Sequence, residues 1–372
     1  MQGKWWPTVE LEPLLTEAKT RLMIRGAQKG TGGLGAALAH QRKETIVAEE
    51  RAGVLNAFED ITEEKRYMHC LSMEHFSEWV KWDNVLKSEP RWNEWIMSGE
   101  DDLFRFNIAA TEDQLPTPSV LKCWKQITDA KCHLCNHPHS SLIHILCGCQ
   151  EALKQGRQTW RHDSILLALY KQIRAMRNQG AASFRQKVKP KTTQTSFVSS
   201  KGNKFSTTAT PADLTLFEGS DDWQLQFDVC VKHDGQMKNS PFPPHIAASG
   251  QRPDGVMWSD KLKTVIWIEL TSPWEENMTR WHFRKHDKYN KLARTVRDNR
   301  WTAHPLCVEV GARGFTSNTW HHMVKTLGKK RSTSRKLRSR VRQVAQRCSY
   351  YIYLNRKNRE WPHPPLIDGY DN

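Results

Sequence analysis

The spacing of hydrophobic residues divides the chain into a helical first part and a mixed second part. Apolar residues recur at helical spacing in residues 8–25, 41–87, 91–110 and about 151–178. Strand-like and helical runs then follow each other over residues 223–231, 254–258, 264–270, 275–298, 306–310 and 317–347. Three strands, a helix, a fourth strand and a final helix predict an α+β fold, in which a small mixed sheet packs against helices.

Composition sets the expected boundaries within this plan. The segment 187–215 is rich in Lys, Thr, Ser, Gln and Pro and poor in hydrophobic residues, which indicates an exposed linker or a long loop. In chain order we expect a helical region, a zinc knuckle, a connecting helix, the linker, a sheet domain and a tail. Their predicted ranges are 1–118, 119–150, 151–186, 187–215, 216–350 and 351–372.

Four residues have the spacing of a tetrahedral zinc knuckle. They follow the pattern Cys-x2-Cys-x8-His-x4-Cys and are Cys132, Cys135, His144 and Cys149. The short Cys-x2-Cys loop lets two thiolates meet one ion, and the last two residues, one helical turn apart, complete the shell. Cys147 is a competing ligand, and a chance cluster of buried thiols and surface histidines is the alternative. Four protein ligands leave no open position, so the expected Zn²⁺ is structural.

A second candidate site lies on the predicted sheet. Asp254 begins one strand and Glu269 lies near the end of the next, so antiparallel pairing across a tight turn would bring the two carboxylates together. Two carboxylates can hold Mg²⁺ or Mn²⁺ with open water positions. Such an ion lowers the pKa of a bound water and neutralises charge on a phosphate. The alternative is that Asp254 is a turn residue and Glu269 a strand-end carboxylate.

The lysine expected two residues after Glu269 is replaced by Thr271. The helix predicted over residues 275–298 offers Lys285 and Lys288, which share one helical face with apolar residues. A lysine on a core-facing side is unfavourable unless it serves a site. We therefore expect Lys285 or Lys288 to orient the nucleophile or stabilise the reacting phosphate, and the sequence does not choose between them. The alternative is that both are solvated.

Charge is distributed unevenly over the chain, whose formal net charge is +16. Residues 1–118 hold 14 Lys and Arg against 20 Asp and Glu, a balance of −6, and residues 119–372 hold 42 against 20, a balance of +22. This basic excess predicts a polyanionic partner, DNA or also RNA, before a membrane. The chain has no apolar run of about 18 residues and no apolar signal-peptide run at its start. We expect an intracellular, nuclear protein.

Basic residues in three places are candidates for nucleic-acid contact. Arg161 and His162 follow the predicted knuckle, and Arg252 precedes Asp254. The segment from Lys325 to Arg347 carries ten basic residues and no acidic one. Its helical spacing predicts a basic face along phosphates, although a solvated helix explains it nearly as well. The candidates in this segment are Lys329, Lys330, Arg331, Arg335, Lys336 and Arg338.

Together these motifs resemble the region downstream of the reverse transcriptase in site-specific non-LTR retrotransposon polyproteins. Those proteins carry a CCHC zinc knuckle and then a restriction-like endonuclease of the PD-(D/E)xK superfamily. The resemblance rests on the knuckle spacing, on Arg161-His162-Asp163, on Arg252-Pro253-Asp254, on Glu269, and on the helix with Lys285, Lys288 and Tyr289. It implies metal-dependent nicking of double-stranded DNA, so that a free 3′ end primes reverse transcription.

The chain departs from that family because it holds no polymerase domain, which in the family precedes the helical region. We expect a metal-dependent endonuclease with a zinc knuckle. One alternative is a nucleic-acid-binding protein of the same origin whose nuclease site is inactive, and another is a relic without function. An active enzyme requires Asp254 and Glu269 close together, with Lys285 or Lys288 facing them. The sequence indicates neither the DNA target nor the oligomeric state.

Overall fold

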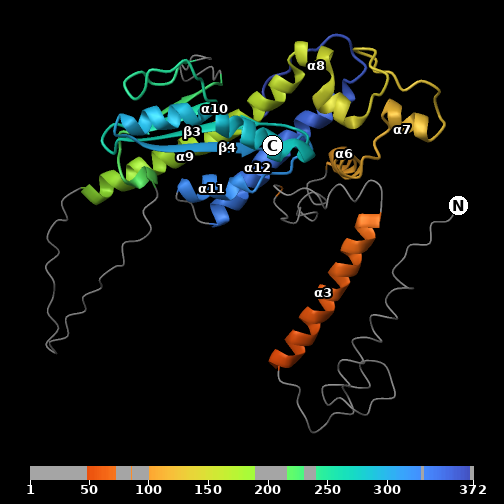
Figure 1. Cartoon of the computed structure of the whole chain (residues 1–372), viewed down its shortest axis with the longest axis horizontal. Helices are drawn as coiled ribbons and strands as arrows, with labels where there is room; N and C mark the ends of the chain where they lie inside the picture. The colour runs from red at the N-terminus through yellow and green to blue at the C-terminus, as the bar shows by residue number, and fades with distance from the viewer. Residues whose placement is uncertain are drawn as a thin grey trace, which may run out of the picture. The chain divides into compact units, whose positions relative to one another are not determined.

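The computed structural model describes residues 48–72, 85, 100–188, 216–229, 240–327 and 331–368 (Figure 1). The chain divides into two compact units, Met1–Lys81 and Trp82–Asn372. The first contains α3 (Ala48–Ser72), which confirms part of the helix predicted over residues 41–87. The helix predicted over residues 8–25 and nearly all of the predicted linker lie outside the described residues. The boundaries predicted for the six regions remain predictions.

Helices precede the sheet in the second unit. They are α6 (Asp101–Thr111), α7 (Pro118–Cys123), α8 (Gln150–Lys154) and α9 (Arg157–Val188), with a π-helical turn, η1 (His144–Gly148), before α8. The prediction of one helix over residues 151–178 is wrong, because α8 and α9 are separate. Gly156 lies between them at φ +75°, a left-handed conformation that favours glycine. None of the described helices is both long and apolar enough to cross a bilayer.

The described strands form one mixed sheet, which confirms the predicted α+β class. They are β1 (Gln224–Phe227), β2 (Gly255–Ser259), β3 (Thr264–Thr271) and β4 (Thr302–Glu309), and they lie in the order β1-β2-β3-β4. The first three strands are antiparallel to their neighbours, whereas β3 and β4 are parallel. The crossover between β3 and β4 contains the turn η3 (Glu275–Asn277) and helix α10 (Met278–Asp298).

Two helices follow β4, where the sequence predicts one helix over residues 317–347. They are α11 (Thr319–Thr326) and α12 (Arg331–Leu354), so the prediction of a single helix is wrong. Gly328 comes directly after the last turn of α11 in the sequence, and glycine there favours a helix end.

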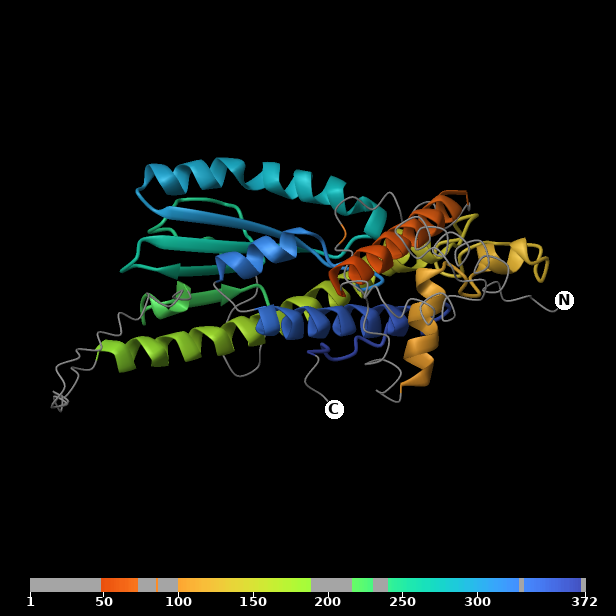
Figure 2. The ribbon, with the colours of Figure 1, turned by 90° about the horizontal axis from the view of Figure 1, so that it is seen from below.

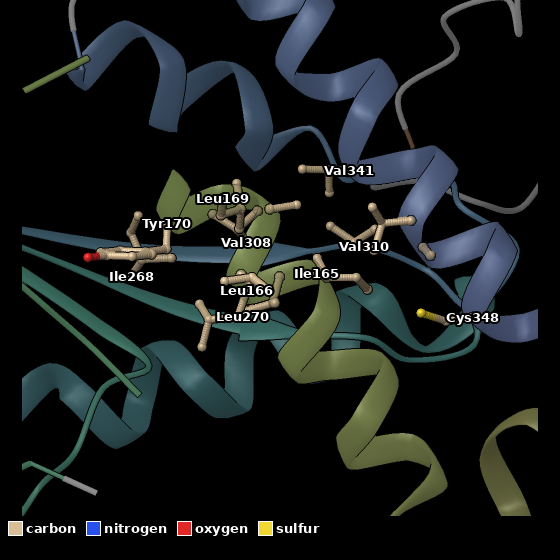
Figure 3. Packing of buried hydrophobic residues seen from close by; sticks show 14 of the residues in the cluster. Ile165, Leu166, Leu169, Tyr170, Ile268, Leu270, Val308, Val310, Val341 and Cys348 are labelled. Atoms are coloured by element: carbon tan, nitrogen blue, oxygen red, sulfur yellow. The ribbon is translucent and has the colours of Figure 1, made fainter. Parts of the chain in front are cut away.

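Alternate residues of β3 face opposite helical layers. Val265 and Trp267 pack beneath α10, and Ile266, Ile268 and Leu270 face α9 and α12. Figure 2 shows α10 on one side of the strands and α9 and α12 on the opposite side. Figure 3 shows the second core from close by, with labelled side chains Ile165, Leu166, Leu169, Tyr170, Ile268, Leu270, Val308, Val310, Val341 and Cys348. Burying one such aliphatic side chain contributes about 1.5–3 kcal/mol.

Asp222 stabilises the turn of the β2–β3 hairpin. Its Oδ1 accepts a hydrogen bond from Ser259 Oγ (2.5 Å), and its Oδ2 accepts one from Lys261 N (2.9 Å). Gly255 then pairs with Ile268 across the two strands. A slip of one residue would turn every β3 side chain to the opposite face. The register of the hairpin thus determines which β3 residues face α10.

A buried ion pair joins the loop after β3 to the loop after β4. Glu275 is 1% exposed and accepts hydrogen bonds from Arg313 N (2.7 Å) and Arg313 Nε (2.8 Å). The guanidinium lies 3.9 Å from the centre of the Trp274 ring. A Cβ atom at Gly311 would lie well inside van der Waals contact of the Glu275 side chain. Glycine is therefore required where the two loops meet.

Gly311→Ala is expected to lower the free energy of unfolding by about 1–3 kcal/mol, because overpacking displaces a buried ion pair. Gly250→Ala is the matched control, since a Cβ atom at Gly250 meets no neighbour within 4 Å. The measurement is urea unfolding followed by tryptophan fluorescence. Equal unfolding midpoints for the two variants would contradict this account of the loop contact.

Candidate functional site

The four residues of the predicted zinc knuckle come together. Their ligand atoms all lie within 4.8 Å of one another, and we call Cys132, Cys135, His144 and Cys149 the Cys3His cluster. The two sulfurs of Cys132 and Cys149 are 3.9 Å apart, and Cys135 Sγ lies 3.3 Å from His144 Nε2. A tetrahedral ion with Zn–S bonds of about 2.3 Å separates its sulfurs by about 3.8 Å. The donor set and its spacing fit a structural zinc ion.

Three short elements position these ligands. The backbone turns tightly after Cys132, whose N–H donates to His137 O (2.9 Å) and whose carbonyl accepts from Asn136 N (3.0 Å). Asn136 has φ +59°, a left-handed conformation that asparagine tolerates. His144 begins the π-helical turn η1, and Cys149 lies at its end, directly before α8. The ligand loop and the helical ligands thus meet from two sides.

Electrostatics favour a neutral imidazole in this cluster. Burial and the nearby His137 lower the pKa of His144, so the ring is available as a metal ligand near neutral pH. Burial raises the pKa of Cys149 to about 12. Burial also opposes ionisation of Cys132, but backbone N–H groups of Cys135 and Leu134 lower its pKa. A bound cation would stabilise the thiolate form of the cysteines.

Cys147, the competing ligand, lies apart from the Cys3His cluster. Its sulfur accepts a hydrogen bond from Arg161 Nη2 (3.6 Å), and burial raises its pKa. The turn η1 sends Cys147 toward α9 while Cys149 faces the other ligands. The structure therefore resolves the choice between the two cysteines in favour of Cys149.

The two predicted carboxylates lie opposite each other at the end of the β2–β3 pair. Because Gly255 pairs with Ile268, the next step in the antiparallel register places Asp254 opposite Glu269. Asp254 Oδ2 accepts a hydrogen bond from Leu270 N (2.7 Å). The Asp254 side chain is 17% exposed and that of Glu269 is 3% exposed. Both carboxylates are thus held at one partly closed position.

Helix α10 brings both predicted lysines to Glu269. Lys285 Nζ donates to Glu269 Oε1, and Lys288 Nζ lies 3.3 Å from the same oxygen. Tyr289 donates to Glu269 Oε2 (2.6 Å), and burial together with Glu269 and Asp254 raises its pKa, so the hydroxyl stays protonated. We call Asp254, Glu269, Lys285, Lys288 and Tyr289 the carboxylate–lysine cluster. Both lysines that the sequence places on one face of this helix therefore reach the same carboxylate oxygen.

His162 contacts Asp254, and this contact was not predicted from the sequence. Its Nε2 lies 3.4 Å from Asp254 Oδ2 and 3.3 Å from Leu270 O, and its Nδ1 lies 3.1 Å from Asp163 Oδ1. Burial alone lowers the pKa of His162, but Asp163 and Asp254 together raise it to about 10. No regular spacing in the sequence connects α9 with the start of β2, so this contact follows only from packing.

Arg161 lies inside the protein and not on a phosphate-contacting surface. It is 1% exposed, and its guanidinium donates to Ser272 Oγ (3.1 Å), Ser272 O (3.1 Å) and Ser349 Oγ (3.2 Å). Arg157 is likewise buried and donates to Asn355 O and Asn358 O. The sequence prediction for Arg161 is corrected, because basic residues one turn apart on α9 face the core and not the solvent.

The basic residues of the C-terminal segment are divided between surface and interior. Lys329 and Lys330, and the side chain of Arg331, lie outside what the structure describes. Arg335 and Lys336 are exposed, and Arg338 is half-buried, which lowers its pKa. Further along α12, Arg342 donates to Gly314 O and Arg347 to Glu100. Arg252, beside Asp254, is exposed.

A second basic surface lies on α10, next to the carboxylate–lysine cluster. The outer side of this helix carries exposed residues of positive charge and an aromatic ring, Phe283, that is 61% exposed. The basic members are Arg280, Arg284, Lys291, Arg294 and Arg297, and we call these the α10 basic face. Acidic residues of α10 interrupt its run of basic residues, so the sequence alone does not reveal this face.

A second buried acid lies on the same side of the sheet. Glu309, at the end of β4, is 1% exposed and lies 3.0 Å from His282 Nδ1 of α10. Thr319 Oγ1 donates to its other oxygen (2.9 Å). The hydrogen bond to Glu309 raises the pKa of His282. The contact between His282 and Glu309 thus holds α10 to the end of β4, near Lys285.

No protein-family model matches the chain, and no curated protein matches it significantly.

Purified protein is expected to bind one zinc ion per chain, measured by elemental analysis and by a chromophoric chelator. Cys135→Ser is expected to lose the ion, whereas His144→Cys is expected to keep it, since four cysteines also form a tetrahedral zinc site. Cys147→Ser is the matched control, two residues from a ligand. Loss of zinc from this control together with retention in Cys135→Ser would contradict the ligand assignment.

Proposed function

We propose that this protein is a metal-dependent DNA endonuclease that nicks one strand, and that its Cys3His cluster holds a structural zinc ion. The observation that carries the proposal is the convergence of Lys285 and Lys288, from α10, on Glu269, whose neighbour across the hairpin is Asp254. Carboxylates on adjacent strands and a cation from a helix are a fitting set for phosphodiester hydrolysis.

The carboxylate pair suits a hard divalent cation. Asp254 and Glu269 lie opposite each other across the β2–β3 pair, and each offers one carboxylate to an ion between them. Mg²⁺ prefers oxygen donors and keeps several waters, which agrees with so few protein ligands, and Mn²⁺ can replace it. When bound, such an ion supplies an activated water and neutralises phosphate charge.

The chain's own groups have separable roles in this proposal. Lys285, whose side chain is 22% exposed, is held closer to Glu269 than Lys288, which is 43% exposed. We assign to Lys285 the stabilisation of charge on the scissile phosphate, and to Lys288 a contact with the neighbouring phosphate. Tyr289 orients Glu269 through its hydroxyl, which also lies 3.2 Å from Arg252 O. Each group therefore acts from a fixed position.

DNA is the proposed substrate because positive charge surrounds the cluster. The α10 basic face runs along the same helix that supplies both lysines, and Arg252 is exposed beside Asp254. Helical spacing lets such residues follow successive phosphates of a duplex. Origin from a non-LTR retrotransposon and a nuclear location belong to the same proposal, supported by the motif order and by the mixed sheet flanked by helices.

A second candidate function is nucleic-acid binding without cleavage. It is favoured by the complete pairing of Glu269, because Lys285 and Lys288 engage Oε1 and Tyr289 engages Oε2. A carboxylate neutralised in this way is stable without a cation, so the same residues would suit a protein that has lost cleavage. The two candidates differ in whether a divalent cation competes with the lysines.

Asp254→Ala and Glu269→Gln are each expected to reduce nicking of supercoiled plasmid by about 100-fold or more, because each removes a carboxylate from the reacting position. DNA affinity in a gel-shift assay should remain similar. Asp260→Ala, in the β2–β3 turn, is the matched control and should nick like the wild type.

Lys285→Met should lose more nicking activity than Lys288→Met. Cleavage by Asp254→Ala at the wild-type rate would exclude the catalytic assignment, and absence of nicking by the wild type would favour the second candidate.

Removing charge from the α10 basic face should weaken DNA binding and its salt dependence. Each lysine or arginine that no longer neutralises a phosphate is expected to reduce the slope of log K against log salt by about 0.9. The test compares Arg284→Ala/Lys291→Ala/Arg294→Ala with Arg335→Ala/Lys336→Ala on α12, by fluorescence anisotropy at several salt concentrations. If only the α12 variant shows a smaller slope, the DNA-binding surface lies on α12 and not on α10.

A further inference from the structure

One contact that the proposed function does not use joins α9 to the carboxylate–lysine cluster. His162 Nε2 lies 3.4 Å from Asp254 Oδ2, the same oxygen that accepts a hydrogen bond from Leu270 N. The imidazole also lies 3.3 Å from Leu270 O, so one ring nitrogen touches the side chain of one strand and the backbone of the next. His162 thus lies where the ends of β2 and β3 meet.

The His162 imidazole is also held at Nδ1, the ring nitrogen that does not contact Asp254. Asp163 Oδ1 lies 3.1 Å from His162 Nδ1, and the Asp163 side chain is 12% exposed. The preceding residue, Arg161, donates to Ser272 Oγ and Ser272 O, which follow β3 directly, and to Ser349 Oγ of α12. The backbone around His162 is consequently held to the end of β3 by a neighbour that cannot move without breaking several buried hydrogen bonds.

The backbone of Asp254 is fixed as well. Its carbonyl accepts a hydrogen bond from Asp228 N (2.8 Å), which extends the pairing of β1 with β2 by one residue. With the main chain held, the remaining freedom of Asp254 is rotation of its carboxylate. Leu270 N and His162 Nε2 hold one oxygen of this carboxylate and thereby determine where the other oxygen points.

The sequence predicts that His162 contacts nucleic acid, and the geometry argues against this. Both ring nitrogens have internal partners, Nδ1 with Asp163 and Nε2 with Asp254 and Leu270 O. The side chain is 25% exposed. A phosphate oxygen would have to displace one of these partners to reach the ring.

We propose that His162, oriented by Asp163, is a positioning residue that sets the carboxylate of Asp254 for cation binding. This inference rests on the proposed function, because it assigns to Asp254 the role of a ligand. A group that orients a ligating carboxylate typically changes cation affinity by about 10- to 100-fold when it is removed. His162 acts through Asp254 and touches neither substrate nor cation.

The experiment measures Mn²⁺ binding and nicking on the zinc-loaded full chain. Free Mn²⁺ is followed by electron paramagnetic resonance, and Asp254→Asn/Glu269→Gln defines the background. His162→Ala is expected to raise the dissociation constant for Mn²⁺ about 10-fold and to lower kcat, with KM for DNA unchanged. His162→Gln should recover much of both, because the amide N–H of glutamine can donate to the same Asp254 oxygen. Asp163→Asn should give an intermediate effect.

Controls separate positioning from a loss of folding. His245→Gln, a half-exposed histidine in the loop before β2 that contacts Asp260, should behave like the wild type. Zinc content and the near-ultraviolet circular dichroism spectrum report whether each variant is folded. If His162→Ala does not fold, His162→Gln is compared with Asp163→Asn. Weaker Mn²⁺ binding by Asp163→Asn, with normal binding by His162→Gln, would still show that an oriented donor to Asp254 is needed.

Two outcomes would overturn the proposal, and they differ from each other. Unchanged Mn²⁺ affinity and kcat in folded His162→Ala, with weaker DNA binding, would make His162 a phosphate contact while the nuclease assignment stands. A wild-type protein whose Mn²⁺ binding does not depend on Asp254 would reject the nuclease assignment together with this role of His162.

Discussion

The antiparallel register of β2 and β3 is the constraint on which the rest of this structure depends. It places Asp254 opposite Glu269, and the hydrogen bond from Leu270 N to Asp254 Oδ2 extends it by one residue beyond the strand. The same register sends Val265 and Trp267 toward α10 and the intervening residues toward α9 and α12. A slip of one residue would exchange both cores and separate the carboxylates at once. Fold and candidate site therefore share one cause.

Buried polar contacts connect the part of the chain that holds the Cys3His cluster with the sheet. Arg161 touches Cys147, which lies between two ligands of the Cys3His cluster, and also Ser272, directly after β3. Leu142 and Leu146, from the same part of the chain, belong to the core that contains β3 and β4. An arginine buried in this way is stable only if its donors are satisfied, so these segments must pack together. The two candidate sites are consequently parts of one compact unit.

Predictions from the sequence succeeded where a local pattern carries the information. Short apolar runs located β2 and β3 almost to the residue, and Cys-x2-Cys with His144 and Cys149 identified the complete Cys3His cluster. Predictions of helix ends were weaker, because Gly156 interrupts a continuous helical pattern by taking a left-handed conformation. The prediction for Arg161 failed since charge alone does not tell a solvated arginine from a buried one with full pairing.

The sequence by itself determined the α+β class, the four residues of the Cys3His cluster and the two strands that carry Asp254 and Glu269, because these depend on periodicity and spacing along the chain. Only the tertiary structure decided that both Lys285 and Lys288 reach Glu269 and that Cys147 turns away from the other cysteines. It also decided that His162 holds Asp254. Contacts of this kind join residues 14 to 92 positions apart. Their partners are chosen by the packing of helices on the sheet, which no local pattern contains.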